Sequence, residues 1–251
     1  MTWSIVARDP MTGYLGIAVS SRFFSVGTLV PHIRGGIGAI ATQAFVNPLY
    51  GVDGLALLAS GTAPDAIINI LTDADAGSAQ RQFHVIDNQG RNAAFTGNAC
   101  VDWAGHLMDQ NVSVAGNMLA GPDVVAATLE VFQKTEGKPM AERFLQAMQA
   151  GQDAGGDKRG KQSAAIVLFR DQDYPWLRLH VDDHADPLSE LARLYAVAQE
   201  RYLHVAETMP TRANPSGMLD RSIIDRKITE LEASRQGAGQ LSASYATPWK
   251  P

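Results

Sequence analysis

The sequence predicts an α+β fold in which two largely antiparallel sheets lie between helices. Strand-like segments occur in blocks, and pairs of helical segments separate the blocks, whereas parallel βαβ folds alternate strand and helix singly. Two pairs of strand-like segments also flank short turn sequences, which is typical of hairpins and therefore of antiparallel pairing.

The expected strands are short runs rich in β-branched, aromatic and small apolar residues. The first two flank the turn sequence Asp9–Gly13, and a second hairpin flanks Asn88–Gly90. The strands are expected at residues 2–8, 14–20, 37–43, 81–87, 91–96, 113–119, 162–169 and 176–182.

The expected helices show apolar residues at helical spacing, and prolines such as Pro64, Pro122 and Pro187 stand at helix starts. Proline suits the first helical turn because the N–H that it lacks would have no partner there. The helices are expected at residues 50–60, 64–71, 122–134, 139–150 and 187–204.

Residues 210–251 differ from the preceding domain, which is expected to span 1–209. In this segment Leu219, Ile223, Ile224, Ile228 and Leu231 recur at helical spacing among charged residues. We expect one amphipathic helix followed by a tail. Two interpretations stay open: a helix docked on its own chain, or an oligomerisation arm around a second subunit of a homo-oligomer.

Composition limits the partners. The 251 residues carry a formal net charge of −5, so the chain has no basic footprint for nucleic acid. The single cysteine, Cys100, excludes an internal disulfide and fits a reducing compartment. No apolar run is long enough for a membrane helix, and the start lacks the layout of a signal peptide. We expect a cytoplasmic protein that acts on a small molecule without a cofactor.

Thr2 is the first candidate catalytic residue. A threonine hydroxyl is a weak nucleophile unless a base removes its proton. If Met1 is removed, the α-amine of Thr2 can be that base, because its ordinary pKa of about 7.7–8.0 is close to working pH. A residue as small as threonine at position 2 permits removal of the initiator methionine.

Five motifs in order resemble the DUF1028 family over roughly residues 2–205. Thr2–Pro10 followed by GIAVSSRFFSVGTLVP resembles the family's start, and the other four are GIGAIATQAFVNPLYG, TGNACVDWAGH, GNMLAGPDVV and AGGDKRGKQSAA. The resemblance implies an αββα four-layer sandwich of the Ntn (N-terminal nucleophile) hydrolase type. It also implies hydrolysis of an amide-type C–N bond, and it names no substrate.

A weaker similarity to proteasome-like sequences concerns the second strand. There a catalytic threonine is followed by a strand that ends in Asp-Ser-Arg, and then by a lysine. In this chain Ser20-Ser21-Arg22 aligns with that motif, so Ser20 stands at the position of the orienting aspartate, and His32 or Arg34 is near the position of the lysine.

Three carboxamide residues and one arginine lie at or near the ends of predicted strands and are candidates for catalysis or substrate binding. Arg22 could hold a substrate carboxylate or form a structural ion pair. Gln43 and Asn47 precede a helix and could position a substrate or stabilise an oxyanion, while Asn47 could instead cap that helix. Asn117 could donate to an oxyanion or be a turn residue with positive φ.

The glycine-rich segment that contains Asp157 and Arg159 could bring charges and backbone N–H groups to a site. It lacks the spacing of a phosphate-binding loop. A possible metal cluster consists of His180, Asp182, Asp183 and His184. It matches no metal-site spacing, so we expect no metal and keep a metal-dependent hydrolase as the weakest hypothesis.

The sequence therefore predicts an amidohydrolase in which Thr2 attacks a carbonyl carbon. The alternative is a binding or interaction module on the same fold without hydrolysis.

Overall fold

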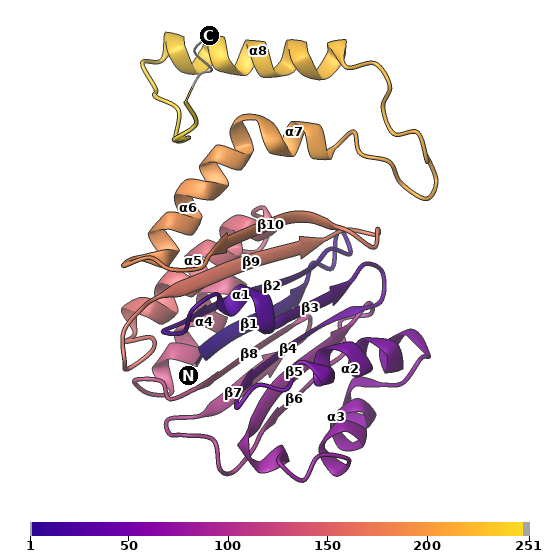
Figure 1. Ribbon diagram of the computed structural model, residues 1–251, viewed down its shortest axis with the longest axis vertical. Helices are drawn as coiled ribbons and strands as arrows, with labels where there is room; N and C mark the ends of the chain where they lie inside the picture. Colours follow the sequence, from indigo (N-terminus) through magenta and orange to yellow (C-terminus); the bar gives the residue numbers. More distant parts are fainter. Residues whose placement is uncertain (1, 248–251) are drawn as a thin grey trace. The chain divides into compact units, whose positions relative to one another are not determined.

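The computed structural model describes residues 2–247, and in it a six-stranded antiparallel sheet contains the N-terminal strand (Figure 1). Strand β1 (Thr2–Arg8) lies near the centre of this sheet, between β2 and β8. The strand order is β10 (Pro175–Val181), β9 (Ser163–Phe169), β2 (Leu15–Ser21), β1, β8 (Val112–Asn117) and β7 (Gly105–Asp109).

A second antiparallel sheet has four strands and faces the first. Its order is β3 (Pro31–Arg34), β4 (Gly38–Ala44), β5 (Arg81–Asp87) and β6 (Asn92–Thr96). The prediction of an α+β fold with two antiparallel sheets is confirmed.

Helices pack against each sheet. Helices α4 (Asp123–Lys134) and α5 (Met140–Asp153) lie along the six-stranded sheet (Figure 1). Phe144 of α5 packs there close to Gly16 of β2. Helices α2 (Leu49–Ala59) and α3 (Pro64–Asp73) pack on the four-stranded sheet, around Ile40 of β4. The other helical segments before β10 are short: α1 (Val26–Leu29) and a 3₁₀ turn (Ser78–Gln80).

The core between the two sheets is apolar at one end and polar at the other. Val6, Ile17 and Val19 of the first sheet pack against Ala41 and Ile86 of the second, and all five are buried. Toward the start of β1 the same faces carry buried polar side chains, which are described below. The fold thus places a polar cluster at the N-terminal end of β1.

The sequence did not predict β3, β7 or α1. Strand β3 begins with Pro31 and lies at a sheet edge, where a proline is tolerated because that side of the strand need not donate to a neighbour. Strand β7 is also an edge strand, and its exposed Leu107 and Met108 break the alternation on which strand prediction depends.

The chain divides into two compact units, one that runs to Leu191 and one that begins at Ala192. The predicted domain boundary at residue 209 stays a prediction. Helix α6 (Pro187–Val197) continues through a π-helical turn (Ala198–Tyr202) into α7 (Leu203–Ala206). Helix α8 (Ser222–Gly237) has the amphipathic spacing predicted for it and buries Ile224 and Ile228; residues 248–251 of the predicted arm lie outside the described residues.

Candidate active site at the start of the N-terminal strand

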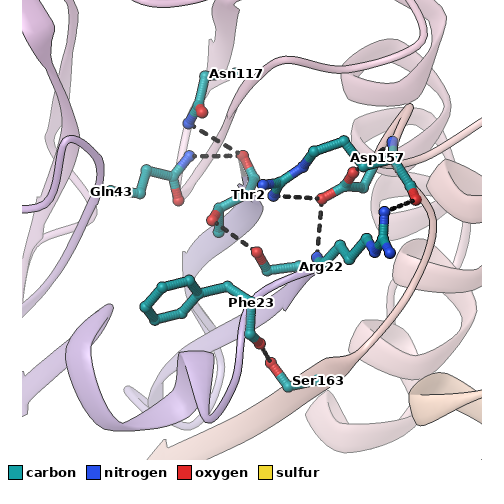
Figure 2. A network of polar contacts seen from close by, with 9 residues as sticks. Thr2, Arg22, Phe23, Gln43, Asn117, Asp157 and Ser163 are labelled. Atoms are coloured by element: carbon teal, nitrogen blue, oxygen red, sulfur yellow. Dashed lines mark hydrogen bonds and ion pairs between the residues drawn. The ribbon is translucent and has the colours of Figure 1, made fainter. Parts of the chain in front are cut away.

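Thr2 is the first residue of β1 and is 6% exposed. Its hydroxyl donates to Ser21 Oγ on the neighbouring strand β2 at 3.1 Å. On the other side Thr2 pairs with Asn117 of β8. Thr2 is therefore held from both neighbouring strands (Figure 2). Met1, whose removal the predicted mechanism requires, lies outside the described residues.

Two carboxamide groups hold the backbone of Thr2. Gln43 Nε2 donates to the Thr2 carbonyl oxygen at 3.3 Å and Asn117 Nδ2 donates to it at 3.4 Å. Both nitrogens also donate to Gln82 Oε1, at 2.8 and 3.0 Å. Since Gln43, Gln82 and Asn117 come from β4, β5 and β8, this cluster joins the two sheets at Thr2.

A second row of polar side chains continues behind the carboxamides. Ser4 Oγ donates to Gln43 Oε1 at 2.6 Å and lies 2.9 Å from His84 Nε2. His84 Nδ1 lies 2.9 Å from Ser113 Oγ. Complete burial lowers the pKa of His84 to about 3, and the charge of His106 acts in the same direction. His84 is therefore neutral at ordinary pH.

The glycine-rich segment is tied to the end of β2 through Asp157, which is buried. Asp157 Oδ2 accepts from the Arg22 backbone N–H at 2.8 Å, and Asp157 Oδ1 accepts from the Arg159 backbone N–H at 2.8 Å. The Arg159 guanidinium also forms an ion pair with Asp157 at 3.3 Å. Asp157 thus organises the loop beside the site (Figure 2).

The side chain of Arg22 is exposed and donates to the Arg159 carbonyl oxygen at 2.9 Å. It forms no ion pair with Asp9 or another acid in the described part of the chain. Arg22 and Arg159 lie in one loop cluster next to Thr2, and their role in substrate binding stays a prediction.

A small pocket of about 60 Å³ opens beside Thr2. Among residues 2–247, Thr2 and Gln43 are its polar lining residues, and none of the lining side chains carries a charge. Phe23 is one of the lining residues and belongs to the turn after β2. Ser163 fixes this turn, because the Ser163 hydroxyl donates to the Phe23 carbonyl oxygen and accepts from the Val26 N–H. The lining residues are Thr2, Phe23, Val26, Leu29, Val30, Gln43, Ala44 and Val46.

Asn47 does not line this pocket. Its Oδ1 accepts from the Leu49 N–H at 3.1 Å, and its carbonyl oxygen accepts from Thr42 Oγ1 and from the Tyr50 N–H. These bonds start helix α2, so the geometry matches the capping interpretation of Asn47. The other alternative for Asn117 is a turn residue with positive φ. The residue with positive φ is the next one, Met118.

Ser20, predicted at the position of the orienting aspartate, does not lie beside the Thr2 hydroxyl. In the β1–β2 register Ser20 is opposite Trp3, so its side chain points to the other face of the sheet from Thr2. Ser21 occupies the place next to Thr2 instead. The serine that contacts the Thr2 hydroxyl is thus the residue after Ser20, and a catalytic role for either serine stays a prediction.

Sequence reasoning also missed Gln82, His84 and Ser113 as parts of the site. Each lies inside a strand, and no turn or motif marks it. The signal that could have found them is alternation: Gln82 and His84 are two apart in β5, as Thr2 and Ser4 are in β1, so each pair shares a sheet face.

No three His, Cys, Asp or Glu side chains of residues 2–247 gather as a metal site would require. His184 Nδ1 accepts from the Asp186 backbone N–H at 3.0 Å. Among the same residues, no helix combines the length and the apolar character needed to span a membrane.

Comparisons with known proteins agree on one family. Residues 2–191 match the model described as a family of unknown function, DUF1028. The crystal structure of a DUF1028 protein from Silicibacter pomeroyi is similar, with 32% identity, a TM-score of 0.81, and coverage of 87% of this chain and 96% of that chain. No curated protein matches this chain. The chain therefore belongs to the DUF1028 family.

Proposed function

We propose that this protein is an Ntn-type hydrolase of an amide C–N bond, with an αββα sandwich and Thr2 as its nucleophile once Met1 has been removed. The observation that carries the proposal is the position of Thr2. It begins a central strand, its hydroxyl lies at a pocket, and side chains from three other strands hold it.

In the proposed reaction Thr2 Oγ1 attacks the substrate carbonyl carbon, and the α-amine of Thr2 accepts the hydroxyl proton. The amine then passes this proton to the leaving nitrogen as the C–N bond breaks. Water hydrolyses the resulting ester and regenerates the hydroxyl. These steps balance without a cofactor.

Gln43 and Asn117 position Thr2 in this proposal. Their amide N–H groups hold the Thr2 carbonyl oxygen, and this fixes the direction of the strand start. Reactive groups that are held in place before the substrate binds lower the entropic part of the barrier. A role for Asn117 as an oxyanion donor stays a prediction. Its amide nitrogen already donates to the Thr2 carbonyl oxygen and to Gln82 Oε1.

The pocket narrows the substrate class. Its volume of about 60 Å³ is far below that of a site for a drug-sized molecule, and the lining side chains that the structure describes are uncharged. We therefore expect the acyl side of the substrate to be short and apolar. A carboxylate on the acyl group would enter an apolar pocket without a partner, which is unfavourable.

The first experiment combines intact mass with active-site labelling. We expect the purified protein to lack Met1 and to form one covalent adduct with a short-chain β-lactone. Thr2→Ala should abolish the adduct, while Thr12→Ala, the same change at an exposed turn threonine, should keep it. A retained Met1, or an adduct of equal yield on Thr2→Ala, would show that Thr2 is not the nucleophile and favour the binding module.

The second experiment tests the substrate class on the same protein. Butyryl and succinyl p-nitroanilides have acyl chains of equal length, and only the second carries a carboxylate. We expect hydrolysis of the butyryl compound to be at least about tenfold faster, from the cost of placing a charge in an apolar site. Faster hydrolysis of the succinyl compound would contradict this substrate class and leave Thr2 as nucleophile intact.

A further inference from the structure

A second pocket lies at the opposite end of β1 from Thr2. Its volume is about 340 Å³, within the range of small-molecule sites. Arg8, the last residue of β1, lines it together with the β7–β8 turn, the end of α4 and Arg143 of α5. At about 3.3 Å per residue, six residues of strand place Arg8 about 20 Å from Thr2. The pocket is thus distinct from the candidate active site.

Arg143 is a charged lining residue of this pocket and is only 6% exposed. Its Nη2 donates to the Phe132 carbonyl oxygen at 3.0 Å, and its guanidinium carbon lies 3.9 Å from the centre of the Phe132 ring. Its Nε has no hydrogen-bond partner, and no carboxylate of the described residues forms an ion pair with it. A buried charge without a paired opposite charge is costly.

Arg8 repeats this pattern. Its backbone N–H donates to the Asn111 carbonyl oxygen at 2.9 Å, but within residues 2–247 its Nε is buried without a partner. Arg8 also forms no ion pair with a carboxylate of that range. Two guanidinium groups therefore line one pocket, and neither is neutralised by a direct partner. Guanidinium is the side-chain group best suited to bind a carboxylate through two parallel hydrogen bonds.

The outer part of the pocket carries the opposite charge. Asp109 and Glu136 are exposed lining residues. Asp109 is oriented by Gln133, whose Nε2 donates to it at 2.5 Å, and by the Gln110 N–H at 2.7 Å. Burial lowers the pKa of Arg143, and the negative charges of Asp9 and of Glu136 act in the opposite direction. The pocket is thus positive at its depth and negative at its rim.

We propose that this pocket binds a small zwitterion of the amino-acid type. Its carboxylate contacts Arg8 and Arg143, and its ammonium group lies toward Asp109 and Glu136. A simple anion would be attracted by the two arginines but repelled by the two rim carboxylates. A simple cation would be attracted by the carboxylates but repelled by the arginines. Only a molecule with both charges matches both ends of the pocket.

The test is calorimetric titration of the full-length protein with the common L-amino acids, after a thermal-shift screen of the same set. We expect at least one to bind, and we expect its N-acetyl derivative and its decarboxylated amine to bind at least about tenfold more weakly. Acetate and phosphate should bind no better than these derivatives.

Variants separate the pocket from the rest of the molecule. Arg8→Met should weaken binding at least about tenfold, and Glu136→Gln should weaken it to a smaller extent because Glu136 is exposed. Arg178→Met, the same change at an exposed position of the same sheet, and Thr2→Ala should both bind as the parent does. Arg143→Met serves as a second variant, provided that it melts as a folded protein.

Three results would overturn the proposal. The first is the absence of binding by every amino acid. The second is equal affinity for the N-acetyl derivative or for acetate, which would make the ligand a plain anion. The third is unchanged affinity in Arg8→Met. None of them depends on whether Thr2 is catalytic.

Discussion

His84 is a fully buried histidine whose proton positions follow from its neighbours. Ser4 has one hydroxyl hydrogen and gives it to Gln43 Oε1, which can only accept. The contact between Ser4 Oγ and His84 Nε2 therefore requires His84 to carry its hydrogen on Nε2. His84 Nδ1 then accepts from the Ser113 hydroxyl. A directed chain of hydrogen bonds thus runs from Ser113 to Gln43 and on to the Thr2 carbonyl oxygen.

His84 should make folding stability depend on pH. Its pKa is about 3 in the folded protein and 6.5 as a free side chain, so below pH 6.5 the unfolded chain binds a proton that the folded chain does not. The free energy of unfolding is therefore expected to fall as the pH falls through that range. Between pH 7 and pH 5 the contribution of His84 is about 2 kcal/mol.

Urea unfolding at pH 7 and pH 5 measures this difference. In His84→Gln, which does not titrate, the loss of stability between the two pH values should shrink by about that amount. His184→Gln changes an exposed histidine and should keep the parent's loss. If His84→Gln loses as much stability between pH 7 and pH 5 as the parent, His84 is not the neutral buried group described above.

At the level of elements, helix α5 fits closely on the six-stranded sheet because β2 carries a glycine where the two meet. A Cβ built on Gly16 would lie 2.5 Å from both Leu168 Cδ2 and Phe144 Cε2. Side chains in a packed core cannot give way by that much without rotamer or backbone shifts. Gly16 thus sets the distance between α5 and the sheet that carries Thr2.

Gly16→Ala should lower the free energy of unfolding by about 1–3 kcal/mol through overpacking. Gly121→Ala is the matched control, since a Cβ there meets no atom within 4 Å and its φ is not positive. Chemical unfolding of both variants gives the comparison. Equal stabilities for the two variants would mean that α5 can move outward at no cost.

The elements that the sequence predicted best have strong periodicity or clear turn signals. Strand β1 and strand β5 begin and end where the patterns placed them. Edge strands β3 and β7 were missed because their exposed residues weaken the alternation. Helix starts shifted by a residue or so, since capping depends on hydrogen bonds that composition does not reveal.

The sequence predicted only those residues of the candidate site that lie near the ends of strands. Thr2, Gln43 and Asn117 occur near strand termini, and the structure brings them together. Choosing Ser21 over Ser20 needs the hairpin register, because a shift of one residue reverses the face of a side chain. Alternation places Gln82 and His84 on one face of β5, but the sequence pattern does not tell that this face lies opposite β1.

For the whole molecule, two independent observations divide the chain at the same place. The family model ends at residue 191, and the first compact unit ends at Leu191. Both proposed pockets are lined by residues of that unit. In the second unit, Glu200 forms an ion pair with Arg235 at 2.7 Å, and Arg193 lies 3.9 Å from the ring of Tyr245. Each unit thus has stabilising contacts of its own.

We therefore predict that a chain ending at residue 209 folds and keeps both proposed sites. This end point follows helix α7 and leaves α6 whole, so no helix is cut. Its thermal unfolding should stay cooperative, its Thr2 should still be labelled by the β-lactone, and its affinity for an amino acid should match that of the full chain. Loss of cooperative unfolding would show that residues 210–251 are needed to fold the first unit. Light scattering on the same two proteins tests the predicted homo-oligomer. Helix α8 leaves Ile223 and Leu231 exposed, so it has apolar side chains that could contact a second subunit. A smaller assembly for the shortened chain would support the oligomerisation arm, and an unchanged assembly would support a helix docked on its own chain.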